Sequence, residues 1–363
     1  MALDVKYQAT VKSQTQDLAY ETEAGAVEGL DEAISAEAAE NTGTAAYTSP
    51  DPTYFERFSL MTVSKTSVTI PAGMSLKING TGYALFENKT VSLSSVGSAS
   101  ARAGKDVYVY AVPDAEDNLL LDIVLSLNST VPSGYTAENS RKIGGFHCLC
   151  IDVGTIENHP LSGYVQGDIL PASVWDLKHR PHSNPEGMVY DEQINRWVDI
   201  YLASYDAGEG LVSVYGGVIA DGASSPKFHC LKFGQYFNQV KKHMPNLYEF
   251  ESFSHGANQG TNISGSADPT TTGGHIDTAN RRMISDIGCE DTCGVLTQWS
   301  RDRGGPYADA KWVNGYDDND DADVKGSSYN APNCERLGGA WDDSSYCGSR
   351  FSLWVHGPLN LGA

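Results

Sequence analysis

Four short runs of β-branched and aromatic residues constrain the fold of this chain more than any other feature. The runs are residues 66–70, 90–93, 106–112 and 119–127, and Gly, Asn and Pro residues separate them. Such side chains favour strands, and short strands with turn residues at this spacing are typical of an antiparallel sandwich or barrel. The sequence therefore predicts a β-sandwich over residues 57–165. Nothing in it resembles a reactive site, so we interpret it as a spacer domain.

The residues before this sandwich have a different composition. Residues 1–56 are rich in Ala, Glu and Thr, and Leu30, Ile34 and Ala38 lie at helical spacing. A stripe this narrow cannot build a core alone. Two prolines flank Asp51 and interrupt regular structure at the end of the block. We expect an N-terminal segment that attaches or oligomerises the protein.

Strand and helix patterns mix in residues 166–363, so the chain is predicted to be α+β. Residues 197–202 and 211–215 read as strands and 236–243 as a short helix, while 253–280 and 301–335 read as long polar loops. A second helix begins near Met244. There Asn246 can cap the helix and Glu249 lies three residues on, the spacing of a capping box.

Charge and cysteine usage limit the classes of partner. The 46 acidic and 25 basic residues give a formal net charge of −21, which repels nucleic acids and anionic membranes. No run approaches the ~20 apolar residues of a membrane helix, and the first residues lack a secretory signal. The seven cysteines match neither a disulfide framework nor a zinc ribbon, so we expect reduced, buried thiols.

The segment 336–361 alternates two kinds of residue. Gly and Trp residues recur in a pattern typical of a rigid scaffold, and small or adaptable polar residues such as Asp342, Ser344, Tyr346 and His356 fill the gaps. Tyr, Ser, Asn and Asp on a rigid frame are typical of antibody-like recognition loops. The composition therefore indicates a binding surface.

Three motifs in the C-terminal half carry a resemblance. They are Met244-Pro-Asn-Leu-Tyr-Glu-Phe250, the run 288–299 that ends in Trp299, and Gly338-Gly-Ala-Trp341 followed by Arg350. In order, they resemble the helix start, a strand and the core turn of C-type-lectin-fold domains of the formylglycine-generating-enzyme type. The blocks 134–147, 173–181, 199–202, 220–227 and 338–358 more closely resemble the variable proteins of diversity-generating retroelements, which include a receptor-binding protein at phage tail-fibre tips. The first fifty-odd residues do not share this resemblance.

The resemblance implies a variable, ligand-binding surface within about 337–363 of a C-type-lectin-fold domain. Adenine-directed mutagenesis of AAC-type codons in that family can produce every residue type at the implied positions. These are Ala340, Asp342, Asp343, Ser344, Tyr346, Leu353, Val355, His356 and Asn360.

The same resemblance implies a structural scaffold under that surface. Its residues are Gly338, Gly339, Trp341, Arg350, Trp354 and Trp299. Large aromatic side chains are more often core than ligand platform. We expect Arg350 to be a buried strut paired with a carboxylate.

No cofactor is expected, with one open alternative. Asp317, Asn319 and Asp321 could supply oxygen ligands to a structural Ca²⁺, although the Gly and distal Glu of an EF-hand loop are missing. A solvated acidic loop is the simpler interpretation. The wider fold also includes cysteine-dependent oxidases, for which Cys289, Cys293, Cys334 and Cys347 are the candidates. Cys289 and Cys293 fall on a motif expected to be buried, where thiols are inert.

Three hypotheses follow. In the first, the chain is a non-enzymatic, viral or phage-type receptor-binding protein with a retroelement-diversified surface. It would form a homotrimer on a virion tail fibre, or lie on a cell surface, and bind a protein or glycan receptor of the host. The second is a fixed-specificity adhesin or lectin. The third is an oxidase of the formylglycine-generating type.

Overall fold

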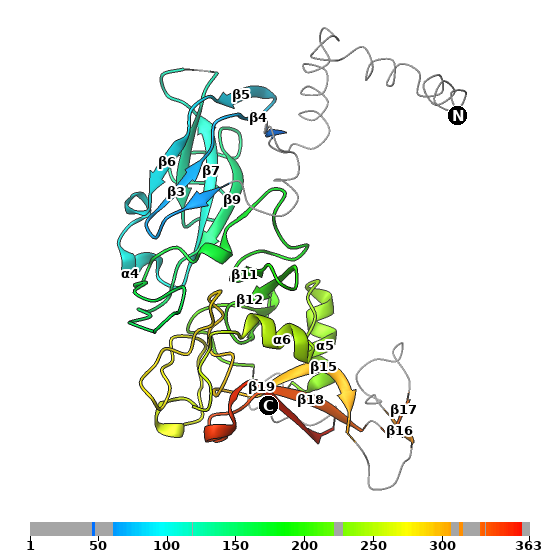
Figure 1. Cartoon of the computed structure of the whole chain (residues 1–363). Helices are drawn as coiled ribbons and strands as arrows, with labels where there is room; N and C mark the ends of the chain where they lie inside the picture. Colours follow the sequence, from blue (N-terminus) through cyan, green and yellow to red (C-terminus); the bar gives the residue numbers. More distant parts are fainter. Residues whose placement is uncertain are drawn as a thin grey trace, which may run out of the picture.

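The computed structural model describes residues 46–47, 61–117, 119–220, 228–305, 312–314, 327–330 and 332–357. Figure 1 shows two bodies. The first body, residues 46–47 and 61–147 with Trp175 and Asp176, consists mainly of β-sheet. The second body, residues 177–357, carries the longer helices and the closing strands. No helix in the described ranges is long and apolar enough to cross a membrane.

Three antiparallel sheets build the first body. Their orders are β2-β3-β6, β1-β4-β5 and β10-β9-β7-β8. The strands are β1 (Ala46–Tyr47), β2 (Thr62–Val63), β3 (Ser67–Ile70), β4 (Met74–Ile78), β5 (Thr81–Leu85), β6 (Lys89–Ser92), β7 (Asp106–Pro113), β8 (Leu121–Ser126), β9 (Arg141–His147) and β10 (Trp175–Asp176). The four strands expected between residues 66 and 127 therefore exist, each within two residues of its predicted ends. One buried apolar cluster, with Val68, Ile70, Val107, Val109 and Ile143 at its centre, joins the sheets.

The second body begins with two hairpins and continues with two helices. The hairpins pair β11 (Met188–Asp191) with β12 (Arg196–Asp199), and β13 (Ser204–Asp206) with β14 (Gly210–Val212). The helices are α5 (Cys230–Gln239) and α6 (Leu247–Phe253). A three-stranded sheet of order β15-β18-β19 closes the chain, with β15 (Gln298–Gly304), β18 (Asn333–Gly338) and β19 (Gly348–His356). A separate hairpin pairs β16 (Trp312–Asn314) with β17 (Ser327–Tyr329).

Short helical turns complete the structure. They are the four-residue α4 (Ala99–Arg102) and the 3₁₀ turns η2 (Leu93–Val96), η3 (Pro171–Ser173), η4 (Ser264–Ser266) and η5 (Ser344–Tyr346).

The capping box at α6 is confirmed. The Asn246 side chain accepts a hydrogen bond from the Glu249 N–H at 2.9 Å, and the Glu249 carboxylate accepts one from the Asn246 N–H at 3.0 Å. The buried side chains of Phe250 and Phe253 then face the core of the second body. All seven cysteines are also reduced and buried, as predicted.

Several element boundaries were predicted wrongly. The helix expected over 236–243 is α5, which begins at Cys230 because the His229 ring caps it, and ends before Lys241, whose φ is +60°. The strand expected over 288–299 starts only at Gln298. The expected loop 301–335 contains the end of β15, the β16–β17 hairpin and the start of β18.

A network of buried polar side chains fixes the irregular segment 254–297. The Arg282 guanidinium donates to both carboxylate oxygens of Glu290 at 2.7 Å, and both side chains are almost fully buried. Glu290 also accepts the Gly274 N–H at 3.0 Å. The neighbouring Asp291 accepts the Gly273 N–H at 2.7 Å and pairs with the His275 ring at 2.8 Å. Side-chain carboxylates thus satisfy backbone groups that no sheet or helix satisfies here.

A second polar chain links the two bodies. His147 of β9 contacts Asp106 of β7 through one ring nitrogen at 3.1 Å and the Tyr201 hydroxyl through the other at 2.9 Å. Tyr201 belongs to the core of the second body. The contact therefore sets where the second body meets the first.

We predict that Arg282→Met destabilises the protein by about 3–5 kcal/mol, because it leaves the Glu290 carboxylate buried without its partner. Chemical denaturation monitored by circular dichroism measures the change. Arg350→Met, which removes an exposed guanidinium, is the matched control and should leave the denaturation midpoint unchanged. A loss below 1 kcal/mol for Arg282→Met would contradict this interpretation.

Asn246→Ala should cost about 1 kcal/mol, since it removes the N-cap acceptor of α6. Asn238 on α5 is exposed, and its side chain makes no hydrogen bond to the described residues. Asn238→Ala is therefore the control. Thermal melts should show a lower midpoint for Asn246→Ala only. Equal melting of the two variants would rule out a stabilising role for the cap.

Candidate functional site

The candidate recognition face, residues 338–357, consists of a tight turn and the edge strand β19. Among the described strands, β19 pairs with β18 alone, with Leu353 opposite Arg336 and His356 opposite Cys334. Register shifts interrupt the pairing twice, so β19 bends along its length. An edge strand next to a turn presents many side chains to solvent while its partner strand is buried.

Two glycines make the turn possible. Gly338 and Gly339 have φ of +87° and +85°, a left-handed conformation that favours glycine. A Cβ at Gly338 would lie 2.4 Å from the Thr292 carbonyl oxygen, and one at Gly339 would lie 2.8 Å from the Cys347 sulfur. Backbone conformation and close packing both require glycine here.

The segment 257–262 supports the turn from behind. The Gly260 N–H donates to the Cys347 carbonyl at 2.7 Å, and the Asn262 amide donates to the Trp341 carbonyl. Gln259 and Ser349 share two hydrogen bonds. The Gln259 Nε2 donates to the Ser349 hydroxyl at 2.8 Å, and the Ser349 N–H donates to the Gln259 Oε1 at 3.1 Å. The recognition face therefore rests on a fixed backbone.

The structure places eight of the nine implied variable positions on this face. Tyr346 and Val355 are 79% and 63% exposed, and Asp342 and Ser344 are also exposed. The half-buried positions are Ala340, Asp343, Leu353 and His356. Asn360 lies outside the described residues.

Asp343 differs from the other eight positions because its side chain supports the turn. Its carboxylate accepts the Ala340 N–H at 2.7 Å, and its carbonyl accepts the Tyr346 N–H at 3.1 Å. Ser344 follows with φ of +51° and begins η5. Replacement of Asp343 therefore changes the turn that carries Tyr346.

His356 is the position with a titratable ring. Burial, and then the nearby Arg336 charge, lower the pKa of His356. The ring is consequently neutral at pH 7, where it both donates and accepts hydrogen bonds.

The tryptophans of the predicted scaffold differ in burial. Trp299 of β15 is buried, and the Arg336 guanidinium lies 4.2 Å from its ring centre. Trp354 is half-buried and packs on Gly304, where a Cβ would lie 2.7 Å from its ring. Trp341 is half-buried against the cluster that contains Met283 and Val295.

The expected burial of Arg350 is wrong. Its side chain is 88% exposed, because its position on the edge strand β19 directs it to solvent. The expected carboxylate partner exists, since Glu251 of α6 lies 3.3 Å away. Solvent screens such a pair, so it contributes little to stability.

Sequence reasoning missed supporting residues that lie outside the three motifs. Ser352 donates to the buried Glu335 at 2.6 Å and accepts from the Trp354 indole at 2.8 Å. Gln259, which supports β19, lies 90 residues away in the sequence. No periodicity or spacing signals such long-range contacts.

The four cysteine candidates for catalysis are all buried. Burial raises the pKa of the Cys289 thiol. It also raises the pKa of Cys293 to about 11 and the pKa of Cys347 to about 12. Cys334 is the exception, because a hydrogen bond from Cys230 lowers its pKa. Cys289, Cys293 and Cys347 are therefore protonated, enclosed thiols, which are poor nucleophiles and poor metal ligands.

Within the described ranges, no three His, Cys, Asp or Glu side chains are grouped so that they could hold a metal ion. The acidic loop Asp317–Asp321, the one proposed calcium site, lies outside those ranges.

Fold and face together define a mostly-β protein that presents diverse exposed side chains from a glycine-dependent turn and an edge strand. Residues 59–176 match the family model of the Mtd second domain. The tail fiber receptor-binding protein of Bordetella phage BPP-1 is 29% identical over 311 residues, which are 80% of this chain and 76% of that protein.

Solved structures agree with this similarity. The Major Tropism Determinant M1 variant has a TM-score of 0.70 and 26% identity, and the match covers 87% of this chain and 82% of that one. The I1 variant gives the same TM-score and identity over 88% and 84%. The chain is therefore Mtd-like in both sequence and fold.

Gly338→Ala should destabilise the protein by at least about 2 kcal/mol, because left-handed backbone and the Thr292 carbonyl both oppose a Cβ. Gly357 is the matched control, since the nearest atom to an added Cβ there is 3.8 Å away. Denaturant titration of Gly338→Ala and Gly357→Ala should separate the two by that amount. If both variants unfold at the same denaturant concentration as the parent, the turn does not depend on glycine.

Proposed function

We propose that the chain is a phage-type receptor-binding protein that attaches to a host surface through the recognition face. The single observation that carries the proposal is the set of exposed, chemically diverse side chains on a backbone held by Gly338, Gly339, Gln259 and Asn262. Similarity to the tail fiber receptor-binding protein supports the same function.

We assign the parts of the chain as follows. Residues 166–363 form a C-type-lectin-fold ligand-binding domain, residues 57–165 a β-sandwich spacer, and residues 1–56 an attachment or oligomerisation segment. The capped helix α6 and the Gly338–Gly339 turn support the lectin-like assignment. The protein would act on a virion tail fibre rather than as an enzyme, and the buried cysteine thiols support the second point.

The proposal includes diversification of the face by a retroelement. Val355, Tyr346 and Asp342 project from the frame, so their replacement costs little folding free energy. A homotrimer would repeat the face three times, and linked copies raise avidity through effective concentration. An imperfect repeat of the 3′ end that differs at adenines, beside a reverse-transcriptase gene, is the genomic sign to seek.

Tyr346→Ala should lower binding to host cells at least tenfold and leave thermal stability unchanged, because a large exposed aromatic side chain is typical of a binding hot spot. Tyr248 of α6 has the same 79% exposure outside the face and provides the control Tyr248→Ala. Flow cytometry with labelled protein measures binding, and calorimetric melting measures folding. Equal loss of binding in both variants, or in neither, would contradict the assignment of the face.

A further inference from the structure

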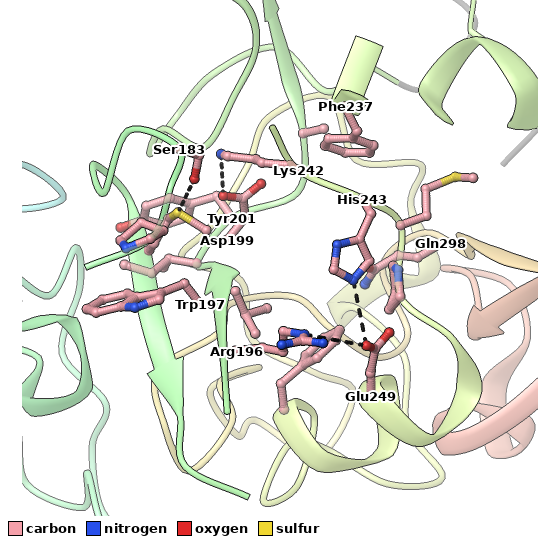
Figure 2. A pocket seen from close by; sticks show the side chains of 18 of the residues that line it. Ser183, Arg196, Trp197, Asp199, Tyr201, Phe237, Lys242, His243, Glu249 and Gln298 are labelled. Carbon is pink, nitrogen blue, oxygen red and sulfur yellow. Dashed lines mark hydrogen bonds and ion pairs between the residues drawn. The ribbon is translucent and has the colours of Figure 1, made fainter. Parts of the chain in front are cut away.

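A cavity of about 580 Å³ opens in the second body, away from the recognition face. The β11–β12 hairpin, the segment after α5 and the start of α6 surround it (Figure 2). Small-molecule sites usually measure about 300–1,000 Å³. No residue of 333–357 lines this cavity, so a ligand here would be independent of the variable positions.

One wall of the cavity is aromatic. The rings of His179, Tyr190 and Trp197 form a cluster with centroids 4.6 to 5.4 Å apart. Figure 2 shows Trp197 on one side of the cavity and Phe237 on the other. Aromatic faces attract the C–H groups of a saturated ring, so this wall suits one face of a ring-shaped ligand.

The remaining walls carry hydrogen-bonding groups of both kinds. Asp199 and Lys242 form a 2.6 Å ion pair (Figure 2). Gln298 also lines the cavity, and its Nε2 donates to the Thr292 carbonyl at 3.1 Å. Trp299 also lines the cavity. Its buried indole N–H donates a hydrogen bond to no acceptor among the described residues. A ligand rich in hydroxyl groups, which both donate and accept, matches such walls.

The charge of the lining is unusual for a chain of net charge −21. Among the described residues, five cationic side chains line the cavity against three carboxylates, those of Asp199, Glu249 and Glu290. The cations are Lys178, Arg180, Arg196, Lys241 and Lys242. The buried Arg282 already compensates Glu290 from outside the lining. The cavity therefore favours an anion.

Charge on Glu249 offsets only part of this excess, because its nearest cation, Arg301, is not among the lining residues. Its carboxylate lies 3.2 Å from Arg301, 3.6 Å from His243 and 4.0 Å from Arg196. The capping box also occupies the N–H groups of Asn246 and Glu249 at the start of α6. The helix terminus is therefore not open to a ligand, and the arginine and lysine side chains are the groups that an acidic group, carboxylate or phosphate, would meet.

We propose that this cavity binds a monosaccharide that carries a carboxylate, of the uronic-acid or sialic-acid class. The sugar ring would pack on Trp197, its hydroxyl groups would bond the Asp199–Lys242 side, and its carboxylate would meet the cationic rim near Arg196.

Isothermal titration calorimetry on the full chain tests the proposal, with D-glucuronate and N-acetylneuraminate as probes, D-glucose as the neutral reference and glucose 6-phosphate as the phosphate comparison. At least one acid should bind tenfold more tightly than glucose. Trp197→Ala and Arg196→Gln should each weaken that binding at least tenfold, about 1.4 kcal/mol. Arg196 is half-exposed and weakly paired, so its replacement leaves folding intact and keeps the test valid if Trp197→Ala is unstable.

Four results would overturn the proposal. They are no binding of either acid, equal binding of glucose, no effect of either variant, and tighter binding of glucose 6-phosphate than of the acids. A change of oligomeric state in Trp197→Ala, measured by sedimentation, would instead assign the cavity to a second copy of the chain. Tyr346→Ala should leave acid binding unchanged, so failure here is distinguishable from failure of the proposed function.

Discussion

The buried ion pair between Arg282 and Glu290 is the interaction on which the second body depends. Residues 254–297 contain one short 3₁₀ turn and isolated bridges, so regular hydrogen-bond ladders cannot hold them. Glu290 and Asp291 take over that role by accepting the N–H groups of Gly274 and Gly273. A buried carboxylate is stable only with such partners, so the backbone and the ion pair stabilise each other.

This arrangement explains how a surface of variable chemistry can be carried without loss of the fold. The ion pair fixes the irregular segment. Gly260, Asn262 and Gly294 of this segment then donate hydrogen bonds to backbone carbonyls of the turn, residues 338–347. Every one of those bonds uses the backbone of the turn. Side chains such as Tyr346 and Val355 take no part in them and remain exposed. Binding chemistry and folding free energy are therefore largely separate in this region.

Local signals in the sequence predicted the parts of the structure that depend on local physics. Strand propensity located β3, β6, β7 and β8, and the three-residue spacing of Asn246 and Glu249 located the start of α6. The same reasoning placed α5 wrongly, because a histidine cap at His229 is an uncommon start signal and a left-handed Lys241 has no signal at all.

The candidate site was predictable only to the extent that its frame repeats a known pattern. The Gly338–Gly339 turn and most of the exposed positions followed from that resemblance. The exposure of Arg350 did not, because whether a strand lies at a sheet edge depends on pairing with distant residues. Gln259 and the aromatic cavity around Trp197 were missed for the same reason: each is assembled from segments far apart in the chain.

The central claim is that the frame and the exposed side chains of the recognition face are separable. Deep mutational scanning of residues 338–357 in a displayed full-length chain, sorted once for protease resistance and once for host-surface binding, tests it most directly. The account predicts that nearly all substitutions at Asp342, Tyr346 and Val355 preserve resistance while many change binding, and that Gly338 and Gly339 accept almost none. Protease sensitivity at the three exposed positions as great as at the two glycines would contradict it.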